Sequence, residues 1–232
     1  MKPPANRVSE HRAKAASFAR VARVALIACT VVCFATGAGA QSHVGAKAAF
    51  GLTSVDAVPD FKKRGLPAFI SPGLFYRYEH KEFAAIQVEA NYIRKGFVRE
   101  TDTATMTPEI TERITAFELP LMAQGFVRLG VFRPYLTGGA TVGYILSRSS
   151  QLQGASAPTP HTFGEYDRRF EYGIAGGGGV GITIASFEIQ AEARYHYNFS
   201  FLRDPIIPGQ NNAYLNSTQL MLSLSISYKI KN

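Results

Sequence analysis

His196 and Ser200 are a pair of residues whose types could do hydrolytic chemistry. An imidazole that takes the proton of a serine hydroxyl makes that hydroxyl a nucleophile able to attack an ester. On a strand, four residues keep both side chains on one face but place them ~13 Å apart, whereas proton transfer needs a contact of ~3 Å. We therefore expect no catalysis from this pair unless the chain turns between them.

The sequence supports metal or cofactor chemistry no better than it supports hydrolysis by His196 and Ser200. His43, His80 and His161 are scattered without the spacing of metal ligands, so we interpret them as solvated or interfacial. The run Gly176–Gly179 is not followed by the Gly-Lys-Ser/Thr of a phosphate-binding loop, and we interpret it as a bend, a bulge or room for a large neighbour within a strand. We predict no catalytic residue, no bound metal and no cofactor.

Charged residues at alternate positions of predicted strands are the third candidate set. Paired carboxylates could act as general acid and base, or they could pair with arginines as salt bridges. We interpret the set as a structural polar network in the lumen of a barrel, made of Arg77, Glu79, Glu89, Glu118, Glu188, Glu192 and Arg194.

Strands are expected to position these residues, and the most clearly predicted strand lies near the C-terminus. Within residues 217–230, every second position from Leu220 to Ile230 is apolar, and the positions between them are mostly serine. A period of two is typical of a strand. Eleven such residues reach ~36 Å, which suits a tilted membrane-spanning strand of ~9–11 residues.

The same alternation predicts seven more strands, over residues 43–52, 67–79, 83–97, 111–125, 132–146, 170–184 and 187–199. The connections alternate in length: long at 53–66, 98–110, 147–169 and 200–216, and short at 80–82, 126–131 and 185–186. This asymmetry is typical of outer-membrane barrels, whose short turns face the periplasm and whose long loops face the outside.

Residues 1–40 are predicted to be a secretory signal peptide. A basic segment precedes the apolar run 24–34, and Ala38-Gly39-Ala40 fits a cleavage site before Gln41. The apolar run is shorter than the ~20 residues of a spanning helix, so a retained anchor is the weaker interpretation. A lipoprotein leader ending at Cys29 is a second alternative, although only two apolar residues separate its motif from Arg23.

Cleavage would change the bulk properties of the chain. The chain has 25 Lys and Arg residues and 17 Asp and Glu residues; six of the basic residues and one of the acidic residues lie in residues 1–40. Removal of this segment would leave a net charge of +3. This charge is too small to indicate nucleic-acid binding. Both cysteines, Cys29 and Cys33, also lie in the leader, so the mature chain can form no disulfide.

These patterns together predict an all-β protein: an eight-stranded antiparallel transmembrane β-barrel of the outer-membrane type over residues 41–232. In a bilayer the apolar faces point to lipid and the polar faces point inward. Because the interior of eight strands is only about wide enough for its own side chains, the charged lumen residues must pair with one another. Tyrosines near the strand ends are expected to form interfacial girdles: Tyr76, Tyr78, Tyr92, Tyr144, Tyr172, Tyr195 and Tyr228.

Four segments carry a resemblance to a known family. They are VEANYIRKGF (88–97), FELPLMAQ (117–124), RPYLTGGATVGYIL (133–146), and YGIAGGGGVGI (172–182) leading to EARYHYNFS. In this order they resemble the PorT-like outer-membrane β-barrel proteins of Bacteroidetes-type bacteria. The resemblance implies an outer-membrane barrel, sometimes linked to protein secretion and gliding. The chain departs from that pattern at its end, which is Tyr228-Lys-Ile-Lys-Asn instead of a terminal aromatic residue.

We therefore expect a non-enzymatic outer-membrane barrel, an envelope component whose extracellular loops bind a partner or support protein secretion. The expected partners are outer-membrane lipids and lipopolysaccharide, the outer-membrane assembly machinery, and secretion or envelope complex proteins, with no nucleic acid; the barrel itself is expected to be a monomer. One alternative is a small-solute pore, which eight strands disfavour. Another is a lipid-modifying enzyme, similar to a small lipid A deacylase barrel with its His-x-Ser pair.

The leader generates the first testable prediction. The mature protein should begin at Gln41 and be recovered with outer membranes, because residues 1–40 carry the features of a cleaved export signal. N-terminal sequencing of the membrane fraction checks this, after enzymatic removal of pyroglutamate if Gln41 has cyclised. An intact residue 1–40 segment, or recovery in the soluble periplasm, would contradict it.

Overall fold

The structure is a computed structural model that describes residues 41–58, 63–80, 83–100, 109–152, 157–163, 169–201 and 214–230. The predicted signal peptide, residues 1–40, lies outside the described residues. Residues 41–232 form one compact unit. In the part of the chain that the structure describes, no helix has the length and apolar character to cross a membrane.

In the described ranges this unit consists of eight long strands and one two-residue strand. Their bounds are β1 (Gln41–Val58), β2 (Lys63–His80), β3 (Ala84–Glu100), β4 (Glu109–Phe126), β5 (Phe132–Leu152), β6 (Thr159–Pro160), β7 (Phe170–Ile184), β8 (Phe187–Phe201) and β9 (Tyr214–Ile230).

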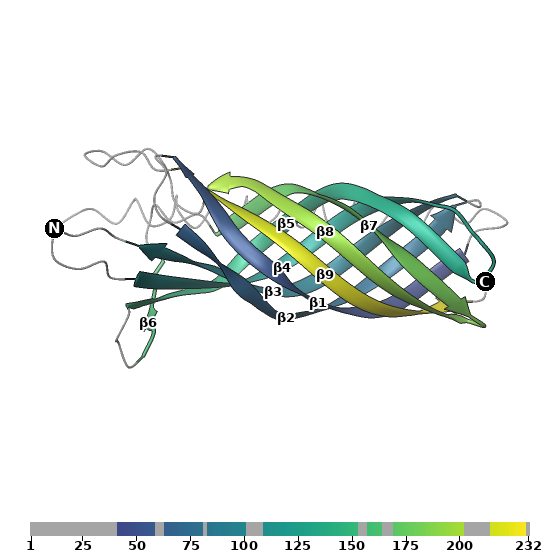
Figure 1. The fold of residues 1–232 in the computed structure, drawn as a ribbon, viewed down its shortest axis with the longest axis horizontal. Helices are drawn as coiled ribbons and strands as arrows, with labels where there is room; N and C mark the ends of the chain where they lie inside the picture. The colour runs from purple at the N-terminus through teal and green to yellow at the C-terminus, as the bar shows by residue number, and fades with distance from the viewer. Residues whose placement is uncertain are drawn as a thin grey trace, which may run out of the picture. The chain divides into compact units, whose positions relative to one another are not determined.

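The eight long strands close into a barrel (Figure 1). Each is antiparallel to its neighbours in the order β4-β3-β2-β1-β9-β8-β7-β5, and a further pairing of β4 with β5 completes the ring. The first and last strands pair along their whole lengths, from Ser42 opposite Ile230 to Val58 opposite Tyr214. The predicted eight-stranded antiparallel barrel is confirmed, and the short β6 only adds to the side of β5.

The connections define two different ends of the barrel. We call one the turn end, with connections 81–83, 127–131 and 185–186, where Gln41 and Ile230 also lie. The other is the loop end, with connections 59–62, 101–108, 153–169 and 202–213. By the rule for this class of barrel, the turn end faces the periplasm.

The strands extend further at the loop end than the sequence predicted. Residues 53–58 and 63–66 were expected in a long loop but belong to β1 and β2, and β5 continues to Leu152 instead of ending at residue 146. The prediction followed the alternation of apolar side chains, which fades where the outer face leaves the lipid. The backbone ladder does not depend on that alternation and continues with its neighbouring strands.

The two faces of each strand have opposite character. On β9 the side chain of Leu224 is 60% exposed, whereas the neighbouring Ser223 is only 9% exposed. The same parity repeats around the ring, so that large apolar residues cover the outside and mostly polar residues occupy the inside. This is the inverted arrangement that a hydrocarbon environment requires.

Aromatic residues mark a belt on the outer face towards the loop end. Cross-strand register places Tyr92, Phe117, Tyr144 and Phe170 in one row over β3, β4, β5 and β7. On β7 and β8, the rings of Tyr172 and Phe199 follow at a centroid distance of 6.5 Å. The row has the position and composition of an interfacial girdle.

The opposed faces generate the second prediction. Leu222→Lys puts a charge on the lipid face of β9 and should cost ~2–4 kcal/mol of folding free energy. Ser225→Lys, the matched control, puts the same charge on the less enclosed lumen side of β9, opposite the part of β8 between Glu188 and Glu192, and should cost less because these carboxylates can pair with it. Urea unfolding of both variants in liposomes measures the difference. Equal losses would mean that the two faces of β9 lie in similar surroundings.

Candidate functional site: the charged lumen

All seven charged residues that the sequence singled out have buried side chains directed into the lumen. They do not form one continuous cluster. The structure divides them among three groups along the barrel: one at the turn end, one in the centre, and a pair nearer the loop end.

Glu89 on β3 is the centre of the middle group. Its two carboxylate oxygens accept hydrogen bonds from Lys47 at 2.6 Å and from Arg194 at 2.8 Å. The amides of Gln87 and Asn91 donate to the same carboxylate at 2.8 and 2.9 Å. Four donors on one buried carboxylate compensate for its removal from water.

Arg194 links this carboxylate to a second one. Its Nη2 also lies 2.8 Å from Glu192, whose other oxygen accepts a 3.2 Å hydrogen bond from the hydroxyl of Tyr135. The glycine run of β7 makes room here, because a Cβ on Gly179 would lie 2.7 Å from the Tyr135 hydroxyl. This close approach agrees with the interpretation of the run as room for a large neighbour.

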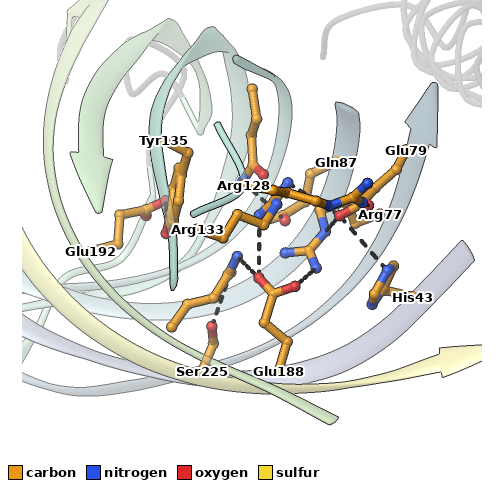
Figure 2. Close-up of polar contacts among 12 residues, drawn as sticks. His43, Arg77, Glu79, Gln87, Arg128, Arg133, Tyr135, Glu188, Glu192 and Ser225 are labelled. Atoms are coloured by element: carbon orange, nitrogen blue, oxygen red, sulfur yellow. Dashed lines mark hydrogen bonds and ion pairs between the residues drawn. The ribbon is translucent and has the colours of Figure 1, made fainter. Parts of the chain in front are cut away.

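The turn-end group contains Arg77, Glu79 and Glu188, with Arg128 and Arg133 added by the structure (Figure 2). Arg77 and Arg133 both donate to Glu188, at 2.9 and 3.2 Å. Their other guanidinium nitrogens lie 3.3 and 3.1 Å from Glu79, which also accepts from Arg128 at 2.5 Å. Two carboxylates thus bridge three arginines from β2, β5 and the turn before β5.

Glu118 is the seventh predicted residue, and it pairs with a histidine. His196 Nδ1 lies 3.4 Å from Glu118 Oε1, and both side chains are buried. Further towards the loop end, Lys95 donates to both oxygens of Glu171 at 2.7 Å. The sequence analysis did not include His196, Lys95 or Glu171 in the network.

Strand parity could have found most of the missed partners. Lys47, Lys95, Arg133 and Glu171 all occupy lumen-facing positions of strands that the sequence predicted correctly. His43 has the same parity, and its interpretation as solvated or interfacial was wrong: its side chain is buried, with Nε2 3.7 Å from Glu79. By contrast, His80 and His161 are exposed.

His196 and Ser200, which were weighed as a hydrolytic pair, have different partners in the described part of the chain. His196 and Ser200 both point into the lumen, where each is only 4% exposed. The Ser200 hydroxyl accepts a hydrogen bond from the backbone N–H of Tyr172 at 3.2 Å, while His196 faces Glu118. A lipid on the outer face of the barrel could reach neither side chain.

Two cavities among the described residues of the lumen differ strongly in size. The central cavity, between Lys47, Asn91 and Arg194, has a volume of about 20 Å³, which is room for about one water molecule. Towards the loop end, Phe97, Ile114 and Ile145 form a buried apolar cluster against which Phe163 packs. At the turn end a larger cavity of about 280 Å³ lies between His43, Arg133 and Glu188.

Fold and lumen together define an outer-membrane type of β-barrel, and a comparison of sequences places the chain within that class. Residues 38–202 match the family model described as the outer membrane protein beta-barrel domain, and the chain belongs to this family. Among curated protein sequences, none matches the chain.

Solved structures with some likeness to this chain include three bacterial barrels. Neisserial surface protein A has 16% sequence identity over 83% of this chain and 99% of its own, with a TM-score of 0.47. Ail, the attachment invasion locus protein of Yersinia pestis, has 16% identity over 82% and 97%, with a TM-score of 0.43. The N-terminal β-barrel domain of Pseudomonas aeruginosa OprF has 13% identity over 82% and 99%, with a TM-score of 0.39.

The central group generates the third prediction. Arg194→Met should destabilise the barrel by ~3–5 kcal/mol, because it leaves buried carboxylates without their guanidinium partner. Thermal unfolding in detergent measures the loss, and Arg94→Met, the same change at an exposed position of β3, is the matched control. Adding Glu192→Gln to Arg194→Met should recover part of the loss. A barrel that tolerates Arg194→Met as well as Arg94→Met would contradict the structural importance of the pair.

Proposed function

We propose that the protein is a non-enzymatic, non-conducting envelope barrel that anchors a binding surface at its loop end. The single observation that carries the proposal is the filled lumen. Buried ion pairs occupy its centre, and an apolar cluster of Phe97, Ile114 and Ile145 lies towards the loop end. A barrel of this kind can interact with its surroundings through its two ends and its lipid-facing surface.

The filled lumen argues against a passive pore. A solute that crossed the barrel would have to displace the Glu89–Arg194 and Glu89–Lys47 pairs, whose partners are 2.8 and 2.6 Å apart. Separating buried charges without a replacement partner costs several kcal/mol. This cost favours a structural role for the ion pairs, which stabilise the barrel, over a role in opening a path for diffusing solutes.

The orientation of the polar side chains argues against a lipid-modifying enzyme. An enzyme acting on lipid needs a nucleophile and a base that a membrane lipid can reach. The described residues of the spanning outer face are mainly apolar and aromatic, and His196 and Ser200 lie on the opposite face. We therefore propose that neither residue has a catalytic function.

The described part of the loop end includes exposed residues that a partner could contact. β5 extends to Leu152, and β6 returns against it with Thr159 opposite Ser150. Phe163 packs on the barrel, and Arg169 lies over its ring at 4.4 Å. Thr159, Pro160 and Thr162 remain exposed on this hairpin. The resemblance to PorT-like barrels leads us to propose a protein of the secretion or envelope machinery as the partner.

Conductance and lipid hydrolysis test the proposal together. The purified mature barrel should give no steady single-channel current in planar bilayers and should release no fatty acid from phospholipid or lipid A. His196→Ala and Ser200→Ala should leave both results unchanged. A stable conductance step would support the pore instead, and fatty-acid release that both substitutions abolish would support the enzyme.

Cross-linking in cells tests the partner. A photo-reactive amino acid at Thr162 on the loop-end hairpin should yield a specific cross-linked protein, identified by mass spectrometry. The matched control places the same group at Leu129, an exposed position at the turn end. Identical products from the two positions, or no product from Thr162, would count against a loop-end partner.

A further inference from the structure

The cavity at the turn end has the features of a binding site and opens where the class of barrel faces the periplasm. Its volume is about 280 Å³, far above the ~10–15 Å³ that a single water requires. We call it the turn-end vestibule; the charged and titratable residues in its lining are His43, Glu79, Arg128, Arg133, Glu188 and Lys229.

Positive groups outnumber negative ones around this vestibule. Among the described residues, Arg128, Arg133 and Lys229 line it, and Arg77 lies directly behind its two carboxylates, Glu79 and Glu188. Four cations therefore face two anions. Arg77 and Arg133 are 0% and 2% exposed, so bulk water contributes little to compensating the excess.

The buried guanidinium groups of Arg77 and Arg133 each contain N–H donors that have no hydrogen-bond acceptor among the described residues. Arg77 Nη1 and Arg133 Nε have no hydrogen-bond partner, and neither does either ring nitrogen of His43. Arg133 Nη2 lies near Glu79 but without the geometry of a hydrogen bond. Figure 2 shows His43, Arg77 and Arg133 converging on the region between Glu79 and Glu188. Buried donors without acceptors are costly. These nitrogens are enclosed, so an oxyanion in the vestibule would compensate their positive charge at short range, while Arg128 and Lys229 in the cavity lining would donate to it directly.

The position of Arg133 is fixed before any ligand arrives. Its guanidinium carbon lies 3.8 Å from the centroid of the Phe126 ring, and Glu188 holds one of its nitrogens at 3.2 Å. A guanidinium held in this way loses little conformational freedom when it binds a carboxylate or a phosphate group. Arg128 and Lys229 at the vestibule could complete the contacts of a doubly charged anion.

We propose that the turn-end vestibule binds a small oxyanion, a phosphate or carboxylate group that enters from the periplasmic side. The excess of two positive charges, the cations Arg128 and Lys229 in the cavity lining and the size of the cavity all favour this ligand class. A cation is disfavoured because both carboxylates already bridge arginines. The filled centre of the lumen makes the vestibule a blind site and not the entrance to a channel.

Binding of inorganic phosphate to the mature barrel in an uncharged, phosphate-free detergent tests the proposal. Isothermal titration at constant ionic strength, with chloride replaced by phosphate, should give saturable binding, and acetate should compete. Arg128→Gln combined with Lys229→Gln should weaken binding by at least about tenfold, as expected for the loss of charge-assisted contacts. Arg94→Gln combined with Arg113→Gln, which removes the same charge from exposed positions near the loop end, should leave it unchanged.

A steric variant separates the cavity from general electrostatics. Ser186 lines the vestibule, and Ser186→Trp fills it without changing its charge and should also abolish saturable phosphate binding. Equal binding by both double variants, a signal that never saturates, or full binding by Ser186→Trp would overturn the proposal. If phosphatidylglycerol competes with phosphate, the natural ligand is a lipid headgroup; if it does not compete, the ligand is a soluble anion. Phosphate binding at the vestibule is a condition for either result.

Discussion

The absence of water in the hydrocarbon core is the constraint on which this structure depends. Each backbone N–H and C=O must find a partner within the protein, and an open sheet edge would leave a row of them unpaired. The pairing of β1 with β9, from Ser42 opposite Ile230 to Val58 opposite Tyr214, removes that edge. Ring closure, more than any side-chain contact, makes the chain able to span a bilayer.

Closure with eight strands then determines what the lumen can hold. The outward positions are taken by apolar residues, so the polar half of every strand is confined to a narrow interior. There the charged side chains satisfy one another, as Glu89 does with Lys47 and Arg194. The exception is the turn end, where four cations face two carboxylates among the residues that the structure describes, and this imbalance distinguishes the vestibule from the rest of the described lumen.

The direction of each side chain could be predicted from the sequence, but its partner could not. Alternation correctly places Arg77 and Glu188 inside, because parity along a strand is a local property. Their contact joins residues 111 positions apart, and it depends on the tilt and stagger of the whole ring, which no local pattern encodes. The apolar cluster of Phe97, Ile114 and Ile145 was missed because alternation was taken to place apolar side chains outside. Ile114 points inward instead, between the polar residues Arg113 and Thr115.

Cysteine-scanning spin labelling of β9 in liposomes tests the central claim, a closed barrel with lipid outside and a filled lumen, most directly. Residues 41–232 contain no cysteine, so in a chain of these residues each label reports a single position from 219 to 228. The account predicts high accessibility to oxygen at even positions and low accessibility to both oxygen and a water-soluble nickel chelate at odd positions. High chelate accessibility at odd positions would indicate a water-filled channel, and a loss of alternation would contradict the barrel in the membrane.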